Sequence, residues 1–279
     1  MSTARDIAAW LATTSRKGPV ELATQSEMDA GTDSDRAVTP DVLRDTVLPG
    51  TLIDEDVFTS SGTWTKPVGC RLVEVTCVGG GGGSAGAGVA ATPEYRIGGG
   101  GGGGGAAKAS FLASNLNATE TVTVGTGGAG GAAGNNAGST GNDSWFKASS
   151  GSYYVKGSGG GGGGAAAADN VGTPGTGGAG SAAGNIANTY MRMYGTDAGG
   201  GNVGTTYRQQ AGGQGGLAYG GVYYAAACAA AGATIAVTGI GGTAFSHGNG
   251  AAGAVVRDVV TTRVGATGSG GVVIVRAYG

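Results

Sequence analysis

The 279-residue chain contains 65 glycines, about three times the ~7% share that is usual in globular proteins. Charged residues make up only 12% of the chain, and 16 Lys and Arg against 18 Asp and Glu give a net charge of −2. This balance excludes the basic surface that a general nucleic-acid-binding protein needs. Glycine adds no side chain to a core and loses the most backbone entropy on folding, so a conventional large hydrophobic core is not expected.

Three other glycine-rich or apolar classes are also disfavoured. Collagen needs glycine at every third residue, a period that this chain does not keep, and only six prolines are present. Apolar β-branched runs and a mean hydropathy of +0.03 argue against a disordered chain. The long uncharged stretch at 209–256 is mostly Ala and Gly, whose transfer into lipid gains little, so no membrane insertion is expected. No apolar secretory stretch is visible at the start, which favours synthesis in a cytoplasm.

The first 50 residues differ in composition from the rest, because they hold only three of the 65 glycines. A short helix is predicted near the start, with Ile7, Trp10 and Leu11 at i, i+3 and i+4 on one face. A second short helix is predicted at 40–48. An apolar stripe on so short a helix needs a partner. Residues 1–50 are therefore predicted to be a separate segment whose short helix packs against a partner, and residues 51–279 a glycine-rich β domain.

Short alternating apolar runs predict β-strands after residue 50. In the run 71–78, Val73, Val75 and Cys77 fall on one face and Glu74 on the other. Similar runs occur at 120–124, 153–156, 234–238, 254–260 and 272–276.

The glycine runs at 79–83, 98–105 and 159–164 separate these strands. Ordered glycine can form extended left-handed helices of three residues per turn, packed so closely that only Gly or Ala fits between neighbours. Glycine loops on a β scaffold are the alternative. The predicted fold class is thus mainly β, with glycine-rich left-handed extended helices of the polyglycine II type or loops, and a short α-helical N-terminal segment.

No catalytic or cofactor site is assigned. The glycine run at 79–83 is not followed by the helix and acidic residue of a dinucleotide site, and no phosphate-binding G-K-[ST] sequence occurs. His247, the only histidine, lies in a glycine-rich turn and is expected to be an exposed loop residue. Cys70, Cys77 and Cys228 contain no C-x-x-C pair, so free thiols are expected rather than a metal site.

Aromatic and basic residues concentrate between 190 and 224. Tyr, Met and Arg are enriched at binding interfaces, and a second reading is that some of these tyrosines form a small aromatic core. As candidate residues of a binding interface we select Tyr190, Arg192, Tyr194, Tyr207, Arg208, Tyr219, Tyr223 and Tyr224.

Three short sequences resemble a known family: ELAT (21–24), AGTD (30–33) and AVTP (37–40). This stretch resembles a segment common in tail-fibre proteins of tailed bacteriophages and prophages. The sequences GTWTKP at 62–67 and GGVVIVRAY at 270–278 look like the start and the closing strand of the glycine-rich domain of such fibres.

The resemblance implies a virion component in the phage tail, assembled in the host bacterial cytoplasm. Such fibres are usually homotrimers. The N-terminal part, with Ile7, Trp10 and Leu11, would attach to tail or baseplate proteins, and the distal part would bind a pilus, a surface polysaccharide or an outer-membrane protein. The expected function is non-enzymatic, multivalent adhesion without metal or cofactor. The alternatives are a surface-exposed Gly/Ala-rich structural protein, and a fibre that also depolymerises the host polysaccharide.

Overall fold

The computed structural model divides the chain into two compact units, Met1–Thr51 with Gly279, and Leu52–Tyr278. The second unit is built of β-strands, so the prediction of a mainly β protein is confirmed. In the part of the chain that is described, the only helical element with defined bounds is the 3-10 turn η1, Ala113–Asn115. The two helices predicted before residue 50 lie outside the described residues. These are 26, 50–147, 154–165, 170–171, 180–183, 188–193, 202–203, 210–211, 228–229, 235–238, 247–259 and 261–279.

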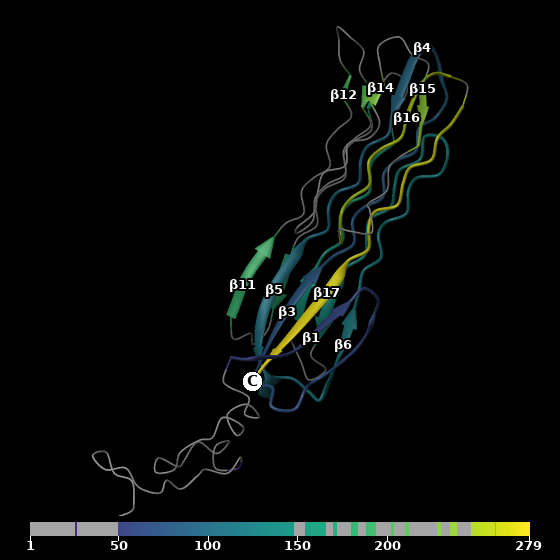
Figure 1. The fold of residues 1–279 in the computed structure, drawn as a ribbon. Helices are drawn as coiled ribbons and strands as arrows, with labels where there is room; N and C mark the ends of the chain where they lie inside the picture. Colours follow the sequence, from purple (N-terminus) through teal and green to yellow (C-terminus); the bar gives the residue numbers. More distant parts are fainter. Residues whose placement is uncertain are drawn as a thin grey trace, which may run out of the picture. The chain divides into compact units, whose positions relative to one another are not determined.

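Two five-stranded sheets pack face to face as a sandwich (Figure 1). The first has the order β1-β17-β3-β5-β11 and the second β10-β8-β7-β6-β2, with every neighbouring pair antiparallel. The strands of the first sheet are β1 Leu52–Phe58, β17 Val272–Tyr278, β3 Leu72–Val78, β5 Ala106–Leu112 and β11 Asn188–Met193. Those of the second are β10 Gly180–Ala183, β8 Tyr154–Gly157, β7 Ser144–Lys147, β6 Thr119–Thr123 and β2 Gly62–Thr65.

The core of the sandwich lies between the two sheets and is made mostly of Val and Ala around three rings. Trp64 and Phe146 meet edge to face with their ring centroids 5.9 Å apart, and Phe111 lies 6.0 Å from Phe146. The face predicted for β3 is confirmed, because Val73, Val75 and Cys77 are fully buried in this core. The expectation that no conventional core forms therefore needs correction here, since the β-branched and aromatic residues are concentrated in the sandwich strands.

Two smaller sheets contain the other strands of the described residues. One has the order β15-β16-β4-β9, in which the short β9 runs parallel to β4, and the other has the order β12-β13-β14. Their strands are β15 Ile235–Val237, β16 Val255–Val259, β4 Ala90–Ile97 and β9 Asn170–Val171, and β12 Asn202–Val203, β13 Gln210–Ala211 and β14 Cys228–Ala229.

Between the sandwich and the four-stranded sheet, the glycine runs form a lattice of hydrogen-bonded backbone strips (Figure 1). In the central strip, residues 79–87, three successive N–H groups donate hydrogen bonds to three different neighbouring strips. The pattern then repeats every three residues. All nine N···O distances are 2.8–2.9 Å. Residues 79, 82 and 85 donate to the strip 98–105, residues 80, 83 and 86 to 136–142, and residues 81, 84 and 87 to 263–271.

The carbonyl groups of the central strip accept from three further strips, which run parallel to it. Gly160 and Gly163, Gly128 and Gly131, and Ala251 and Ala254 supply the N–H groups. The six outer strips also bond to one another, each antiparallel to the next, in the closed order 98–105, 158–164, 136–142, 125–131, 263–271 and 248–254. They enclose the central strip, and residues 79–88 are all buried. Backbone groups in this interior are therefore paired with one another, without side chains of any size.

Candidate functional site

The receptor-binding residues predicted from sequence are only partly covered by the structure. Tyr190 and Arg192 belong to β11, the outermost strand of its sheet, and Tyr190 falls at an irregularity in the pairing with β5, between Thr189 and Met191. Tyr194, Tyr207, Arg208, Tyr219, Tyr223 and Tyr224 lie outside the described residues, as do Ile7, Trp10 and Leu11.

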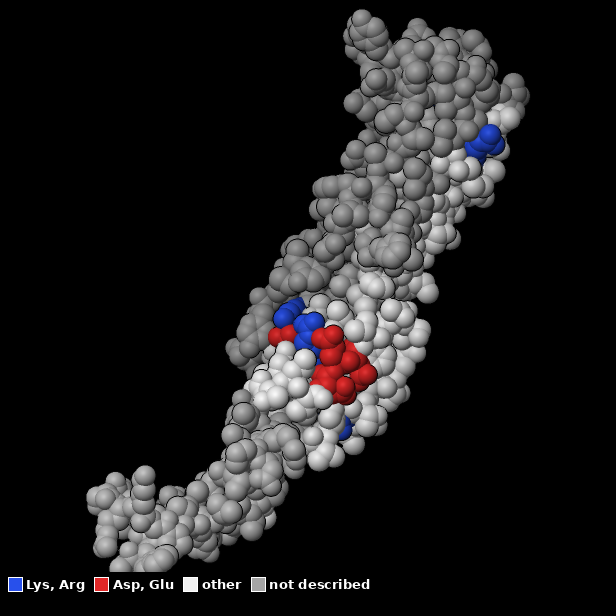
Figure 2. Space-filling model, in the orientation of Figure 1, with Lys and Arg blue, Asp and Glu red and all other residues white. Residues whose placement is uncertain are grey.

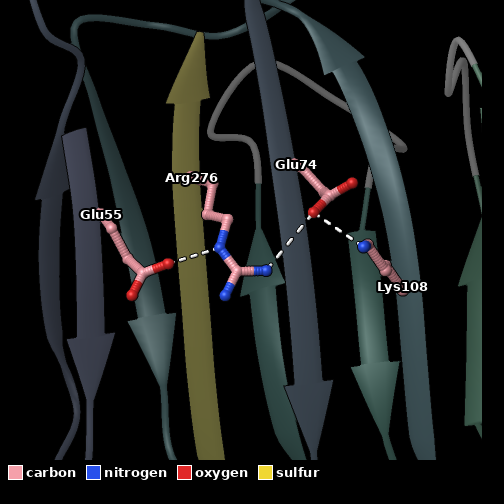
Figure 3. Close-up of polar contacts among 4 residues, drawn as sticks. All are labelled: Glu55, Glu74, Lys108 and Arg276. Carbon is pink, nitrogen blue, oxygen red and sulfur yellow. Dashed lines mark hydrogen bonds and ion pairs between the residues drawn. The ribbon is translucent and has the colours of Figure 1, made fainter. Parts of the chain in front are cut away.

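A row of charged side chains crosses four strands of the first sheet (Figure 3). Arg276 on β17 contacts Glu55 on β1 through its Nε and lies 3.7 Å from Glu74 on β3 through Nη1. Lys108 on β5 extends the row, with its Nζ 2.8 Å from the same Glu74 oxygen. The hydrogen bond that Arg276 donates to Glu55 is the main cause of the raised pKa of Arg276. Glu74 thus lies within ion-pair distance of two cations, while Glu55, 40% exposed, ends the row.

An acidic patch lies over β1, at the open edge of this sheet (Figure 2). Asp54, Glu55 and Asp56 are consecutive, and the strand has a described neighbour, β17, on one side only. Burial, and after it the Asp54 carboxylate, raises the pKa of Asp56. Exposed Leu52 and Val57 flank the acidic residues. The edge therefore combines negative charge with apolar surface.

A further ion pair joins the sandwich to the lattice. Asp143 precedes β7, contacts Lys156 on β8 and accepts a hydrogen bond of 3.0 Å from the backbone N–H of Gly159. Partial burial alone would raise the pKa of Asp143, but the bonds from Lys156 and Gly159 outweigh it and hold the pKa below its usual value. The pair fixes the point at which β8 passes into a glycine strip.

The described residues contain no group of three or more His, Cys, Asp and Glu side chains placed to hold a metal ion. Burial raises the pKa of the Cys70 and Cys77 thiols, which form no disulfide, and so disfavours their reactive thiolate forms. His247 is half-buried in a turn rather than fully exposed as expected. Within the same residues, no helix is long and apolar enough to cross a membrane.

Sequence reasoning missed the charged row and the acidic edge. The alternation in 71–78 correctly placed Glu74 opposite the core face, but nothing in the sequence reveals that residues 55, 276 and 108 lie beside it. These partners are brought together by strand order, because β17 closes the sheet between β1 and β3.

Comparison with known proteins gives one family. The glycine-rich domain family matches residues 57–278, which include all the strips and strands described above except the start of β1. Comparison with curated proteins gives no match. Because the family match spans more than half of the sequence, the chain belongs to the glycine-rich domain family.

Proposed function

We propose that this chain is a receptor-binding tail-fibre protein of a tailed bacteriophage or prophage, and that it acts by non-enzymatic adhesion. The observation that carries the proposal is the path of the chain through the lattice. One strip ends at residue 164 and the next begins at 248, and every residue of the predicted Tyr/Arg cluster falls in between. Apart from β10 and β11, which pair within the sandwich and include Tyr190 and Arg192, this stretch adds no strip to the lattice among the described residues and is free to vary in sequence, which suits a protein that must recognise changing surfaces. The resemblance of residues 21–40 to tail-fibre segments supports the same assignment.

We further infer that the strips are left-handed helices of the polyglycine II type. Three successive N–H groups of the central strip point to three neighbours, and the fourth returns to the first neighbour. A backbone that turns by one third of a circle per residue produces this pattern, as three residues per turn requires. A crystal structure would test the inference, with an expected rise of about 3.1 Å per residue along each strip.

We propose that the protein is a homotrimer joined to tail or baseplate proteins through residues 1–50. Light scattering should then give three times the chain mass of 26.4 kDa. Replacing Ile7, Trp10 and Leu11 together by Ser should reduce this mass or abolish attachment to the tail. A folded monomer from the unaltered protein would contradict the trimer.

Adhesion would depend on several weak contacts acting together. Three tips on one fibre, and several fibres on one virion, give high avidity without a strong single site. The receptor would be a pilus, a surface polysaccharide or an outer-membrane protein on the host.

The experiment that tests the function is adsorption of the purified chain to candidate host cells. Unaltered cells are compared with cells stripped of pili or of surface polysaccharide. One variant replaces Tyr207, Arg208, Tyr223 and Tyr224 by Ala. Its control replaces Val68 and Arg71 by Ala, because both are exposed on the sandwich and Val68 is 99% exposed.

Binding that is lost with one surface structure would support adhesion and identify the receptor. The fourfold variant should lose binding while its unfolding curve stays unchanged, and the control should bind normally. Absence of binding to every strain would contradict the proposal. Release of reducing sugar from the polysaccharide would show depolymerase activity and contradict a purely adhesive role.

A further inference from the structure

The outer face of the second sheet presents an aromatic side chain, Trp145, to solvent. Of the exposed large apolar side chains identified in the described residues, it is the only one on a strand of this sheet. Its neighbours on β7, Ser144 and Phe146, are fully buried, so the alternation of the strand turns the indole away from the core. The residue is 36% exposed. Tryptophan is enriched among the residues that contribute most to binding, so Trp145 is a candidate contact residue.

Polar groups lie on both sides of the indole. In the strand register Trp145 is opposite Thr123 of β6 on one side and Lys156 of β8 on the other. Lys156 contacts Asp143, which precedes Trp145 by two residues. The Asp143 carboxylate also accepts the backbone N–H of Gly159 at 3.0 Å. The side chains of Asp143 and Lys156 hold each other in place, yet they are 43% and 34% exposed. An aromatic ring is thus bordered by a hydroxyl, an ammonium and a carboxylate group.

The extent and the charge of this surface indicate its occupant. Towards β6 and β2 the exposed positions of the face carry only threonines, which are Thr63, Thr65, Thr119 and Thr121. A protein interface needs a contiguous apolar centre within about 800 Å² on each partner, which a single indole does not supply. The ammonium and the carboxylate cancel in charge, so a charged ligand gains little. A sugar ring, with an apolar C–H face and hydroxyl groups at its edge, is complementary to this surface.

We propose that the outer face of the second sheet around Trp145 binds a neutral sugar residue of a host surface polysaccharide. The C–H face of the sugar packs on the indole, and the sugar hydroxyl groups exchange hydrogen bonds with Thr123, Lys156 and Asp143. The site adds a contact to each chain in addition to the predicted Tyr/Arg cluster, and such contacts combine in a multivalent fibre. That the polysaccharide comes from the host rests on the proposed function, whereas the sugar chemistry rests on the residues of this face.

The test measures binding of the full-length chain to immobilised dextran, mannan and galactan, to polysaccharide extracted from candidate host cells, and to anionic polygalacturonate. The variants are Trp145→Ala, Trp145→Tyr and Thr123→Val. The control for Thr123→Val is Thr65→Val on the same face. Thr65 is opposite Thr119, which lies four residues from Thr123 along β6, or about 14 Å. The control for Trp145→Ala is Leu112→Ala, because Leu112 is 49% exposed and lies on the first sheet.

The expected result is binding to at least one neutral polymer, weakened about tenfold or more by Trp145→Ala and about fivefold by Thr123→Val. Trp145→Tyr keeps a flat ring and should retain most of the binding, and both controls should bind normally. Thermal unfolding establishes that each variant folds. Equal losses in Thr123→Val and Thr65→Val, tighter binding to polygalacturonate than to every neutral polymer, or binding to no polymer would overturn the site.

Oxidation of Trp145 by N-bromosuccinimide tests the site in the unaltered protein. The reagent should modify exposed Trp145 and leave Trp64, which is 1% exposed, intact. A bound neutral polymer should slow the oxidation of Trp145 in proportion to the bound fraction, whereas polyethylene glycol should not, as peptide mapping by mass spectrometry measures. Unchanged oxidation in the presence of a polymer that binds would place the binding elsewhere. Protection that grows with protein concentration alone would mean that a second copy covers the face. Either outcome would overturn the proposal.

Adsorption to cells separates this site from the proposed function. Polymer binding that depends on Trp145, in a protein that adsorbs to no cell, would support the sugar site and contradict the adhesin. Adsorption to cells without binding to any polymer would support the adhesin and overturn the sugar site. Adsorption that Trp145→Ala leaves unchanged, while polymer binding is lost, would overturn the host polysaccharide as the source of the sugar.

Discussion

Glycine in the lattice is required by the closeness of the neighbouring backbones. A Cβ atom on Gly82 would lie 2.0 Å from the carbonyl oxygen of Gly161, which is far inside van der Waals contact. At Gly270, in an outer strip, the nearest atom to such a Cβ is the carbonyl oxygen of Gly125 at 3.8 Å, an ordinary contact. The same substitution should therefore have opposite consequences at the two positions.

Gly82→Ala should lower the free energy of unfolding by about 3 kcal/mol or more, because the strips must move apart and lose their hydrogen bonds. Gly270→Ala should leave it unchanged or raise it by about 0.4–1 kcal/mol, since alanine restricts the unfolded chain. Urea unfolding followed by circular dichroism measures both. Similar values for the two variants would contradict a closely packed lattice.

The reactivity of the Cys77 thiol tests whether the sandwich core excludes solvent and reagents. Because burial raises its pKa, the thiolate is scarce at pH 8, and the side chain is also shielded from reagents. Iodoacetamide should leave Cys77 unmodified in the folded protein and modify it in urea, while half-buried Cys70 reacts at an intermediate rate. Peptide mapping by mass spectrometry separates the two sites. Rapid modification of Cys77 without denaturant would show that reagents enter the core of the folded protein and would contradict its full burial.

The charged row ties together four strands of one sheet. Glu74, with its side chain 16% exposed, forms ion pairs with both Lys108 and Arg276, so neutralising it weakens the contacts of two cations, although Arg276 keeps Glu55. We expect Glu74→Gln to lower the free energy of unfolding by about 1–3 kcal/mol. Glu55→Gln should cost at most about 1 kcal/mol, because Glu55 is 40% exposed. Thermal or urea unfolding gives both values. Equal losses of unfolding free energy in the two variants would contradict a larger contribution from Glu74 than from Glu55.

The acidic residues of β1 should prevent the sheet edge from pairing with a second copy. Antiparallel pairing of two β1 strands about Glu55 would set Asp54 of one copy opposite Asp56 of the other, and like charges in opposed positions are destabilising. Replacing both aspartates by Asn should therefore increase self-association at pH 7. Light scattering against concentration measures it.

The same edge should respond to pH in a defined direction. The pKa of Asp56 is raised, so its charge is lost at a higher pH than that of an ordinary aspartate. Self-association of the unaltered chain should thus increase as the pH falls towards about 4–5, and less so in the double Asn variant, which has no aspartate charge left to lose. An unaltered protein whose light scattering stays constant over this range would contradict the edge as the site of pairing.

The sequence pattern predicted the strands in which β-branched residues alternate with polar ones, and it missed strands that lack this alternation. The runs at 71–78, 120–124 and 272–276 appear as β3, β6 and β17. In contrast, β5 has the sequence AAKASFL, in which alanine weakens the β signal although both flanking strands hold it in place. The charged row could not be predicted, because its residues come from distant parts of the chain.

At the scale of the molecule, the lattice makes folding depend on distant parts of the chain. The central strip bonds to strips that end as far along as residue 271, so its hydrogen bonds form only after long loops have closed. Loop closure is entropically costly, and such non-local topologies fold slowly. The small side chains within the lattice bury little apolar surface, so they offset little of this entropy cost until the last strips have paired. The lattice should therefore open cooperatively rather than strip by strip.

Hydrogen exchange tests this cooperativity. All nine amides of residues 79–87 are bonded to other strips and buried, so they should exchange only when the whole lattice opens, with a denaturant dependence equal to that of global unfolding. Exposed Val264 and Thr267, in an outer strip, should exchange much faster. Mass spectrometry with peptide resolution follows both groups. Fast exchange at 79–87 would mean that the glycine runs behave as loops on a β scaffold, whereas slow, global exchange requires that bonds between backbones hold the lattice as one unit.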